Sequence, residues 1–292
     1  MNPQLFHIYG PLYVQWYGVW IVIALLVFMW RAHKHELCKK LFAKDQLVSL
    51  VMRSIFVGFV GGKLLHIISA YHEYSSWQEI LYFWEGGLSI LGAVLALLIY
   101  VPYYLYSRKI PLGLACDFLA IYAPLLQSIA RIGCFFAGCC YGAQTLLPWA
   151  VIYSDVSVAA PCNVPLHPTQ LYSAGVLFIF FLTLRFVVYP LLRKKHALGW
   201  GLITCLYLAL MSMERFVIDF FRADRVINDS SALIQSTVLS MHQWVALGIF
   251  GVSIAGFIGI YIVRRAHAVA EAMARTQGER DKRSSRTESR AL

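Results

Sequence analysis

Charged side chains are scarce in this sequence. Asp, Glu, Lys and Arg make up 14% of its 292 residues, whereas a soluble globular domain carries roughly a quarter. Hydrophobic residues make up 59%, and the mean hydropathy is +0.63. The shortage of charge excludes an ordinary soluble domain and predicts an all-α integral membrane protein.

Paired metal-ligand motifs, internal repeats and heptads are also missing. The seven cysteines do not follow the C-x-x-C spacing of a zinc site, so we expect no metal and no cofactor. A net charge of +10 could indicate nucleic acid binding, but the basic residues form short blocks between apolar runs, as anchors on an anionic membrane surface do. We therefore expect a lipid bilayer as a partner and no nucleic acid.

Seven apolar runs are each long enough to cross about 30 Å of hydrocarbon, which takes about 20 helical residues. They cover residues 12–30, 46–70, 86–106, 113–137, 168–192, 198–221 and 240–263. The first run is longer than a signal-peptide core and has no small-residue cleavage site, so we expect it to remain as a helix. The sequence predicts a seven-transmembrane-helix bundle over residues 1–263 and a basic, disordered cytoplasmic tail over residues 264–292.

Basic residues mark one side of the predicted bundle. Blocks that begin at Arg31, Arg108, Arg193 and Arg264 follow the first, third, fifth and seventh runs, whereas residues 71–85 hold three glutamates and neither lysine nor arginine. The basic side is cytoplasmic by the positive-inside rule. The N-terminus is then periplasmic and the C-terminus cytoplasmic.

Unusual polar residues gather at the outer ends of the predicted helices. They are Tyr17, Lys63, His66, Ser89, Gln127, Arg131, His167, Gln170, Arg215 and Asp219. Chance would distribute such residues over both leaflets, so we infer a polar cavity that opens to the outer leaflet. The ordinary polar asymmetry of seven-pass folds is the alternative.

Two predicted helices present arginines to the same leaflet. Gln127, Arg131 and Cys134 share one helix face. The same spacing recurs in the sixth run at Arg215, Asp219 and Arg222. A guanidinium binds phosphate with a bidentate fork, which favours a phosphate-binding role for Arg131 and Arg215. An interhelical ion pair, such as Arg131 with Asp219, and snorkelling to the interface are the alternatives.

His167 precedes a proline at the start of the fifth run. Proline suits the first turn of a helix, so His167 is expected at the mouth of the cavity. A histidine there can exchange a proton at neutral pH. A structural hydrogen-bonding role is the alternative.

Seven short motifs follow one another along the chain. They are Trp16-Tyr17-Gly18, Gly61-Gly62-Lys63, residues 84–89, Asp117, Arg131-Ile132-Gly133 with Gly142, Pro148-Trp149 with residues 167–172, and residues 215–222. In this order they resemble the prolipoprotein diacylglyceryl transferases of bacterial inner membranes. The resemblance implies transfer of the diacylglyceryl group of phosphatidylglycerol to the lipobox cysteine of a prolipoprotein, with both substrates reached from the outer leaflet.

The polar pattern and the resemblance together nominate the site residues. We expect catalytic roles for Tyr17, Arg131, His167 and Arg215. We expect substrate-binding roles for Arg131, Gln127, Lys63, Ser89, Gly133, Gly142, Gln170, Asp219 and Arg222.

Four positions depart from the family pattern. Cys134 replaces an asparagine, Cys139 a glutamate and Asp219 a glutamate, and Leu91 occupies the place of a histidine commonly regarded as catalytic. Two other functions therefore stay open. One is a paralogue that uses the same phospholipid cavity for cysteine thiol chemistry, and the other is a non-catalytic phospholipid-binding protein.

Four cysteines fall on the predicted outer side, which is oxidising in a bacterium. Cys139 and Cys140 are adjacent and poorly disposed to bond each other, so we expect a disulfide from Cys162 to one of them. The alternatives are a reactive Cys134 thiol beside Arg131 and small apolar packing residues.

Overall fold

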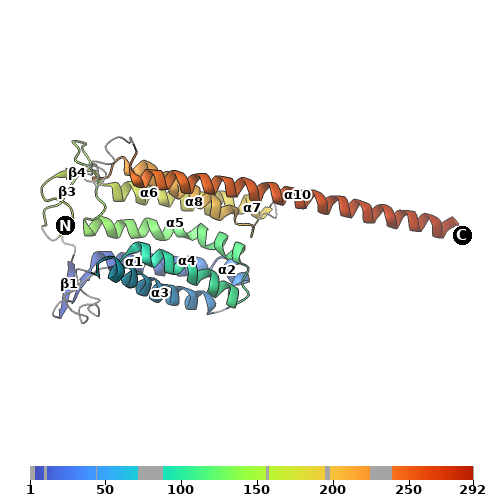
Figure 1. The fold of residues 1–292 in the computed structure, drawn as a ribbon, viewed down its shortest axis with the longest axis horizontal. Helices are drawn as coiled ribbons and strands as arrows, with labels where there is room; N and C mark the ends of the chain where they lie inside the picture. The colour runs from blue at the N-terminus through green and yellow to red at the C-terminus, as the bar shows by residue number, and fades with distance from the viewer. Residues whose placement is uncertain are drawn as a thin grey trace.

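Long helices aligned along one axis make up most of the computed structural model (Figure 1). The structure describes residues 4–9, 12–43, 45–71, 88–155, 158–194, 198–223 and 239–291. The long helices are α1 (Trp16–His33), α3 (Gln46–Ser69), α4 (Ile90–Ser107), α5 (Leu112–Ala137), α6 (Thr169–Leu182), α8 (Leu202–Asp219) and α10 (Met241–Ala291). The π-helical η4 (Thr183–Val188) and α7 (Tyr189–Lys194) extend α6, and α2 (Glu36–Leu41) follows α1.

Two small antiparallel sheets lie at one end of the helices. β1 (Gln4–Tyr9) pairs with β2 (Leu12–Gln15), and β3 (Val151–Ile152) pairs with β4 (Pro165–Leu166). They are too short to alter the fold class, so the prediction of an all-α membrane protein is confirmed for the described residues.

Six described helices are long and apolar enough to cross a membrane. They are Trp16–His33, Gln46–Ser69, Ile90–Ser107, Leu112–Ala137, Thr169–Lys194 and Met241–His267. The chain is a multi-pass membrane protein. The expected span over residues 198–221 corresponds to α8, whose 18 residues include Glu214, Arg215 and Asp219. These three charges separate α8 from the six apolar helices.

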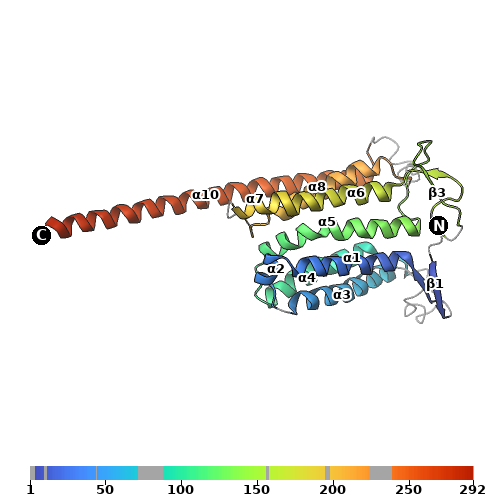
Figure 2. The same ribbon diagram turned by 180° about the vertical axis from the view of Figure 1, so that it is seen from behind.

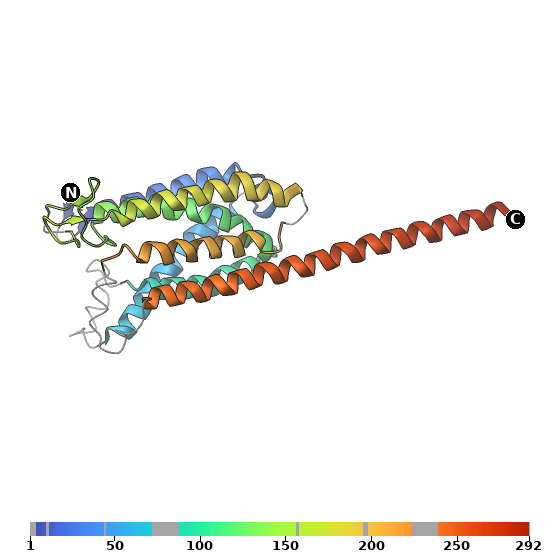
Figure 3. The same cartoon turned by 90° about the horizontal axis from the view of Figure 1, so that it is seen from above.

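The last helix is much longer than its apolar part. α10 continues from Met241 to Ala291, whereas the sequence predicts a disordered tail from residue 264. Alanine, glutamate and arginine recur in this stretch and are strong helix formers. Figure 3 shows the extension projecting beyond the other helices.

The central helix of the bundle is α5. It packs along α1 on one side and α6 on the other, and it also contacts α8, an arrangement that Figure 2 shows from behind. Its buried face includes Phe118, Ile121 and Tyr122. Because α5 contacts these three helices, packing fixes the position of both of its ends.

The α3 and α4 helices form a tightly packed hairpin. A Cβ added to Gly61 would lie 2.3 Å from Ala96 Cβ and 2.8 Å from Gly92 O, so the two helices approach closely where neither has a side chain. Ser89 N donates to Gly62 O at 3.1 Å and fixes the start of α4 against α3. Glycine pairs that permit such approach are typical of membrane helices.

Asp117 ties the opposite end of α5 to the start of α8. Its fully buried carboxylate accepts bonds from Gly199 N (3.1 Å), Gly201 N (3.2 Å), Thr204 N (3.1 Å) and Thr204 Oγ1 (3.0 Å). All four donors belong to the turn before α8 or to its first turn. The acid that the sequence places in the fourth helix therefore orients α8 from the end remote from Arg215.

Candidate functional site

The predicted site residues lie at the end of the bundle that carries the two sheets (Figure 1). Tyr17 lies in the first turn of α1, Lys63 and His66 lie in the last turns of α3, and Ser89 precedes α4. Arg131 lies near the end of α5, and His167 precedes α6. The residues predicted at 84–87 lie outside the described residues.

Three cysteines meet where α5 ends. Gly138 adopts the left-handed conformation (φ 65°), its N–H bonds to Phe135 O at 3.2 Å, and Cys139 N bonds to Cys134 O at 3.2 Å. These two bonds form a Schellman motif, which folds the chain back over the last turn of the helix. As a result the sulfur atoms of Cys134, Cys139 and Cys140 all lie within 4.8 Å of one another.

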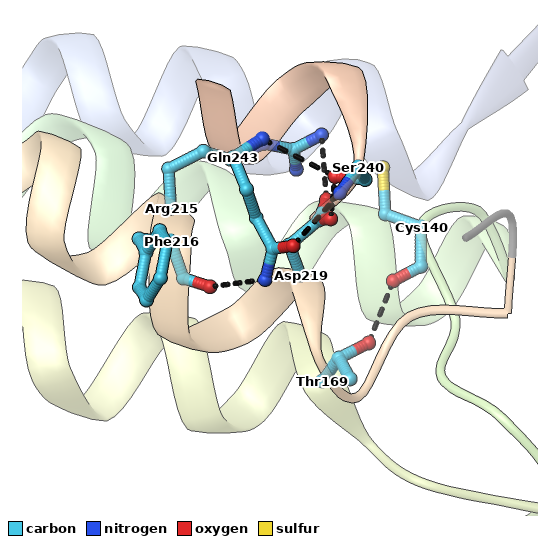
Figure 4. A network of polar contacts seen from close by, with 7 residues as sticks. All are labelled: Cys140, Thr169, Arg215, Phe216, Asp219, Ser240 and Gln243. Carbon is cyan, nitrogen blue, oxygen red and sulfur yellow. Dashed lines mark hydrogen bonds and ion pairs between the residues drawn. The ribbon is translucent and has the colours of Figure 1, made fainter. Parts of the chain in front are cut away.

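The first turn of α6 holds the backbone of this cysteine cluster. Thr169 Oγ1 donates to Cys140 O at 2.7 Å, and Gln170 Nε2 donates to Cys139 O at 2.8 Å. Figure 4 shows the Cys140 carbonyl turned toward Thr169 and its thiol on the opposite side. Cys140 has φ 60°, a conformation that costs a non-glycine residue about 1 kcal/mol or more. The α6 bonds hold that strained geometry.

Short backbone ladders join this loop to its neighbours. Gly142 N donates to His167 O (3.0 Å), His167 N donates to Ala143 O (3.0 Å), and Ala143 N donates to Phe221 O (2.8 Å). A Cβ on Gly142 would lie 2.5 Å from His167 Cβ and 2.6 Å from Phe221 O. Gly142 therefore permits close packing of these segments, and the substrate contact that we expect from sequence stays a prediction.

Two guanidinium groups act on the cysteine cluster. Hydrogen bonds from the Cys134 and Cys139 thiols lower the pKa of Cys140, and the charges of Arg222 and Arg131 act in the same direction. Hydrogen bonds with the Cys134 and Cys140 thiols raise the pKa of Cys139. Within the cluster, Cys140 is thus the thiol whose ionised form is favoured beside the two cations.

Helix α1 brings Tyr17 to the same place. A Cβ on Gly133 would lie 2.9 Å from Trp20 Cβ and 3.4 Å from Tyr17 Cα, so Gly133 lets α1 pack closely against α5. Tyr17 is 38% exposed and lies within electrostatic range of Arg131 and of all three cysteines of the cluster. Gly133 is thus a packing residue that positions Tyr17.

Arg215 is held within its own helix. Its guanidinium lies 3.6 Å from the buried Asp219 carboxylate, and the other Asp219 oxygen accepts a hydrogen bond from Ser240 Oγ (Figure 4). Ser240 and Gln243 form a capping box at the start of α10: Gln243 N donates to Ser240 Oγ at 3.2 Å, and Ser240 N donates to Gln243 Oε1 at 2.9 Å. Asp219 therefore joins the end of α8 to the start of α10.

An apolar cavity lies beside Arg215, between α8 and α10. Its volume is about 270 Å³. The other lining residues are Leu208, Met211, Ser212, Met241, His242, Val245, Ala246 and Ile249. A cation at the edge of an apolar groove matches an amphiphile with an anionic head.

His167 lies in an aromatic cluster. Its Nδ1 is 3.3 Å from Tyr172 Oη, which accepts a bond from Trp149 Nε1 at 2.7 Å, and its ring is 5.5 Å from that of Phe221. The side chain is half-buried.

The comparison with known proteins gives the family. The sequence profile of the family described as prolipoprotein diacylglyceryl transferase matches residues 3–259. The chain belongs to this family. It is 32% identical over 257 residues to the phosphatidylglycerol-prolipoprotein diacylglyceryl transferase of Clostridium tetani, which covers 88% of this chain and 99% of that protein. It is 31% identical over 279 residues to the Thermotoga maritima protein of the same name, with 90% and 85% covered. The resemblance inferred from the short motifs is confirmed.

Several residues nominated as substrate-binding in this transferase-family chain have structural partners, and their substrate roles stay predictions. Ser89 Oγ accepts a bond from Gly92 N (3.4 Å) and caps α4. Gln170 is buried and binds the Cys139 carbonyl, and its Nε2 lies 3.5 Å from Tyr153 Oη. Gln127 is half-buried and its side chain hydrogen-bonds Tyr207, while its Oε1 has no hydrogen-bond partner among the described residues.

The expected disulfide is not formed. All seven cysteines are free, and the Cys162 thiol donates to Asp155 O at 3.3 Å. Tyr153 holds this segment over α5. Its backbone O accepts a hydrogen bond from Asn163 N at 2.7 Å, and its hydroxyl donates to Phe135 O at 3.0 Å. The loop is thus fixed without a covalent bond to the cysteine cluster.

The position of the family's histidine contributes no proton-handling group. Leu91 lies in the first turn of α4 and is 62% exposed, as an apolar side chain in contact with lipid would be. Titratable groups that do lie within electrostatic range of Arg131 are Tyr17 and the Cys134 and Cys140 thiols.

Two residues of this site are missing from the sequence-based set. Glu214 is buried in α8 and accepts a hydrogen bond from Ser173 of α6, and Ser240 connects α10 to Asp219. Signals for both are present: a carboxylate within an apolar run is a site candidate, and Ser240 with Gln243 has the spacing of a capping box.

Proposed function

We propose that the protein transfers the diacylglyceryl group of phosphatidylglycerol to the cysteine thiol of a prolipoprotein lipobox, with release of glycerol phosphate. Family membership gives the reaction class. The observation that carries the proposal is the clustering of Tyr17, Arg131 and Arg222 with three thiols at one end of the bundle, near the end of α8 that carries Arg215. An anionic phospholipid needs such a set of cations, and a thiol acceptor must reach the same place.

The reaction makes strong demands on phosphate binding. The acceptor sulfur attacks the glycerol carbon next to the phosphate, a C–S bond forms, and the C–O bond to phosphate breaks. The thiol gives up its proton, and the departing phosphate takes the electron pair and a second negative charge. Interactions that strengthen as this charge develops lower the barrier.

Arg131 is assigned to the phosphate. Among the described residues no carboxylate lies within ion-pair distance of Arg131, since the Asp219 carboxylate pairs with Arg215. A guanidinium without a carboxylate partner keeps its paired N–H donors available for bidentate binding of a phosphate. Tyr17, on the facing helix, is a second donor to the same group.

Arg215 is assigned to the entering lipid. Asp219 fixes its side chain, and the adjoining cavity between α8 and α10 offers an apolar wall to an acyl chain. His167, at the other side of the loop that holds the thiols, is assigned as proton acceptor for the acceptor thiol.

Membrane placement follows from the two ends of the bundle. We infer seven spans: the six apolar helices and α8, whose charged residues lie toward the end of the bundle that carries the site. The basic residues Arg108 and Arg193 lie at the opposite end, with α2 and α7 (Figure 1), which makes the site end periplasmic in a bacterial inner membrane. An epitope inserted at Ala159 should be accessible in intact spheroplasts, whereas a C-terminal epitope should not; the reverse pattern would overturn this orientation.

A reconstituted assay tests the function. The purified protein is mixed with vesicles of phosphatidylglycerol labelled in its head group, with and without a lipobox peptide, and glycerol phosphate release is measured. Peptide-dependent release together with a lipidated peptide supports the transferase. Release without peptide indicates another thiol chemistry, and no release under either condition indicates a non-catalytic lipid-binding protein. Arg108→Lys, exposed at the opposite end, is the matched control for arginine variants.

A further inference from the structure

The cysteine cluster lies at the same end of the bundle as Leu91, which replaces the histidine of the family. Leu91 leaves the start of α4 without a titratable side chain, yet the acceptor thiol must still be deprotonated before it attacks. At the same end of the bundle Cys134, Cys139 and Cys140 bring three sulfur atoms within 4.8 Å of one another. Three sulfur atoms this close can act as ligands of one cation.

We propose that Cys134, Cys139 and Cys140 form a three-thiolate site for a thiophilic divalent cation, Zn²⁺, whose fourth position takes the acceptor thiol. The fourth-position claim rests on the proposed transferase function, whereas the cation site itself does not.

The distances suit zinc. Thiolates bind Zn²⁺ at about 2.3 Å, so two ligands of a tetrahedral site are about 3.8 Å apart. The three sulfur atoms lie within 4.8 Å of one another. Small side-chain rotations would shorten these separations to about 3.8 Å, because the cysteines lie at the end of a helix and in a turn. Catalytic zinc sites keep three protein ligands and one open position, which is the number of thiols present.

The charges of the surroundings also fit. Three thiolates and one Zn²⁺ carry a net charge of −1, and the guanidiniums of Arg131 and Arg222 lie close enough to act on the cluster. The cations would offset this charge when the site is filled.

The backbone presents the thiols before any ion arrives. The Schellman motif at Gly138 folds Cys139 over Cys134, and Thr169 and Gln170 bind the carbonyls of the two adjacent cysteines. Cys140 is kept in a left-handed conformation that costs energy. Because specific hydrogen bonds retain this strained conformation of Cys140, we attribute it to a functional role of the thiol rather than to packing.

The open zinc position promotes deprotonation of the acceptor thiol, a function that Leu91 cannot provide. Binding of the acceptor thiol to Zn²⁺ releases its proton to His167, the assigned proton acceptor, since zinc strongly favours a bound thiolate. That thiolate attacks the glycerol carbon, the C–S bond forms as the C–O bond breaks, and the phosphate leaves with the electron pair and one added negative charge. The thioether product is a weak zinc ligand, so the position becomes free again.

Metal content tests the cation site without reference to activity. The full-length protein, purified from membranes in detergent without chelator, should contain about one zinc per chain by elemental analysis. Cys134→Ser, Cys139→Ser and Cys140→Ser should each retain less than a tenth of that amount. Cys162→Ser and Cys116→Ser, which change cysteines outside the cluster, should keep the full content. A wild-type protein without zinc, or cluster variants that all retain it, overturns the proposal.

Two further measurements protect this result from misfolding and from oxidation. Cys140→Gly places the residue best suited to φ 60°, so its loss of zinc cannot be attributed to backbone strain; retention of zinc would exclude Cys140 as a ligand. Mass spectrometry of protein alkylated before and after reduction should find no disulfide within the cluster. A disulfide between any two of its cysteines in the membrane-purified protein overturns the zinc site.

Cobalt tests the open position. Co²⁺ exchanged for zinc should show thiolate-to-metal charge-transfer absorption, and a lipobox peptide should increase it, whereas the same peptide with serine in place of its cysteine should not. An unchanged spectrum contradicts the fourth-position claim. If the spectrum responds but no glycerol phosphate is released in the reconstituted assay, the transferase function fails and the cation site remains.

Discussion

The Asp219 carboxylate bridges two elements: it lies 3.6 Å from the Arg215 guanidinium, one turn back along α8, and accepts a hydrogen bond from Ser240 at the start of α10. Because Asp219 is buried, its two oxygens are committed to these partners. Asp219 thus orients the Arg215 guanidinium beside the α8–α10 cavity, and it can do so without contacting the substrate.

Asp219→Asn tests this positioning role. The amide removes the charge that attracts Arg215 but can still hydrogen-bond Ser240, so the fold should survive while activity in the reconstituted assay falls about tenfold. A purely structural role would lower the melting temperature and leave the activity of the folded protein unchanged. Arg215→Lys should lose more, about tenfold to a thousandfold, because the bidentate fork is lost.

Arg131 and Arg222 should differ although both lie near the thiols. Arg131→Lys keeps the charge but not the fork that we assign to phosphate, so activity should fall about tenfold to a thousandfold. Arg222→Lys preserves the positive charge that acts on Cys140 and should be mild. Steady-state rates with saturating lipid and peptide compare the two. Full activity in Arg131→Lys would contradict the assignment of Arg131 to the phosphate.

Sequence patterns predict the helices and the side on which the polar residues gather. Apolar length and the i, i+4 spacing are local properties, and the described helices follow them closely. The same spacing also placed Arg215 and Asp219 on one face. It could not decide between an Arg131 and an Arg215 partner for Asp219, because that choice depends on helix packing.

The cysteine cluster shows the limit of such patterns more clearly. The spacing of Cys134, Cys139 and Cys140 does not match a paired metal motif, and their meeting depends on the reversal at Gly138. A helix followed by glycine predicts that reversal, so this signal was present in the sequence. The position of Cys162 depends instead on bonds of its loop to Asp155 and Tyr153, which no local pattern gives.

His35 should make the protein sensitive to acid. Burial lowers the pKa of His35 to about 4 from its ordinary value of 6.5, and the Arg185 charge adds to the shift; both ring nitrogens lack hydrogen-bond partners among the described residues. The unfolded chain therefore binds a proton below about pH 6.5 that the folded chain refuses until about pH 4. Stability is complete above pH 6.5 and should fall by about 3 kcal/mol as the pH decreases to 4.

Thermal unfolding in detergent at several pH values measures this effect. His35→Phe, which suits the surrounding rings of Phe118, Tyr122 and Tyr189, should flatten the profile between pH 6.5 and 4. The exposed His33 provides the control, and His33→Gln should keep the profile of the wild type. An unchanged slope in His35→Phe would assign the acid sensitivity to other groups.

Gly61 and Gly58 provide a matched pair on one helix. Gly61→Ala drives a methyl to 2.3 Å from Ala96 Cβ, and overpacking of this kind costs about 1 to 3 kcal/mol. In Gly58→Ala the new methyl lies 3.7 Å from the nearest Leu97 atom, an ordinary contact, so the better helix propensity of alanine should stabilise by up to about 1 kcal/mol. Melting temperatures should move in opposite directions, and equal shifts would show that α3 and α4 are not closely packed.

Variants of Asp117 test whether this acid has a structural or a catalytic role. In Asp117→Asn an amide NH₂ replaces one carboxylate oxygen and faces either the Gly199 and Gly201 N–H groups or the Thr204 donors. Buried donors without acceptors cost about 1 to 3 kcal/mol each, so the melting temperature should fall strongly. Thr204→Val removes only one donor and should cost about 1 kcal/mol. Because Asp117 lies at the end of the bundle remote from Arg131, activity per folded molecule should stay near that of the wild type at low temperature in both variants. A large loss of activity without a loss of stability would place Asp117 in the reaction itself.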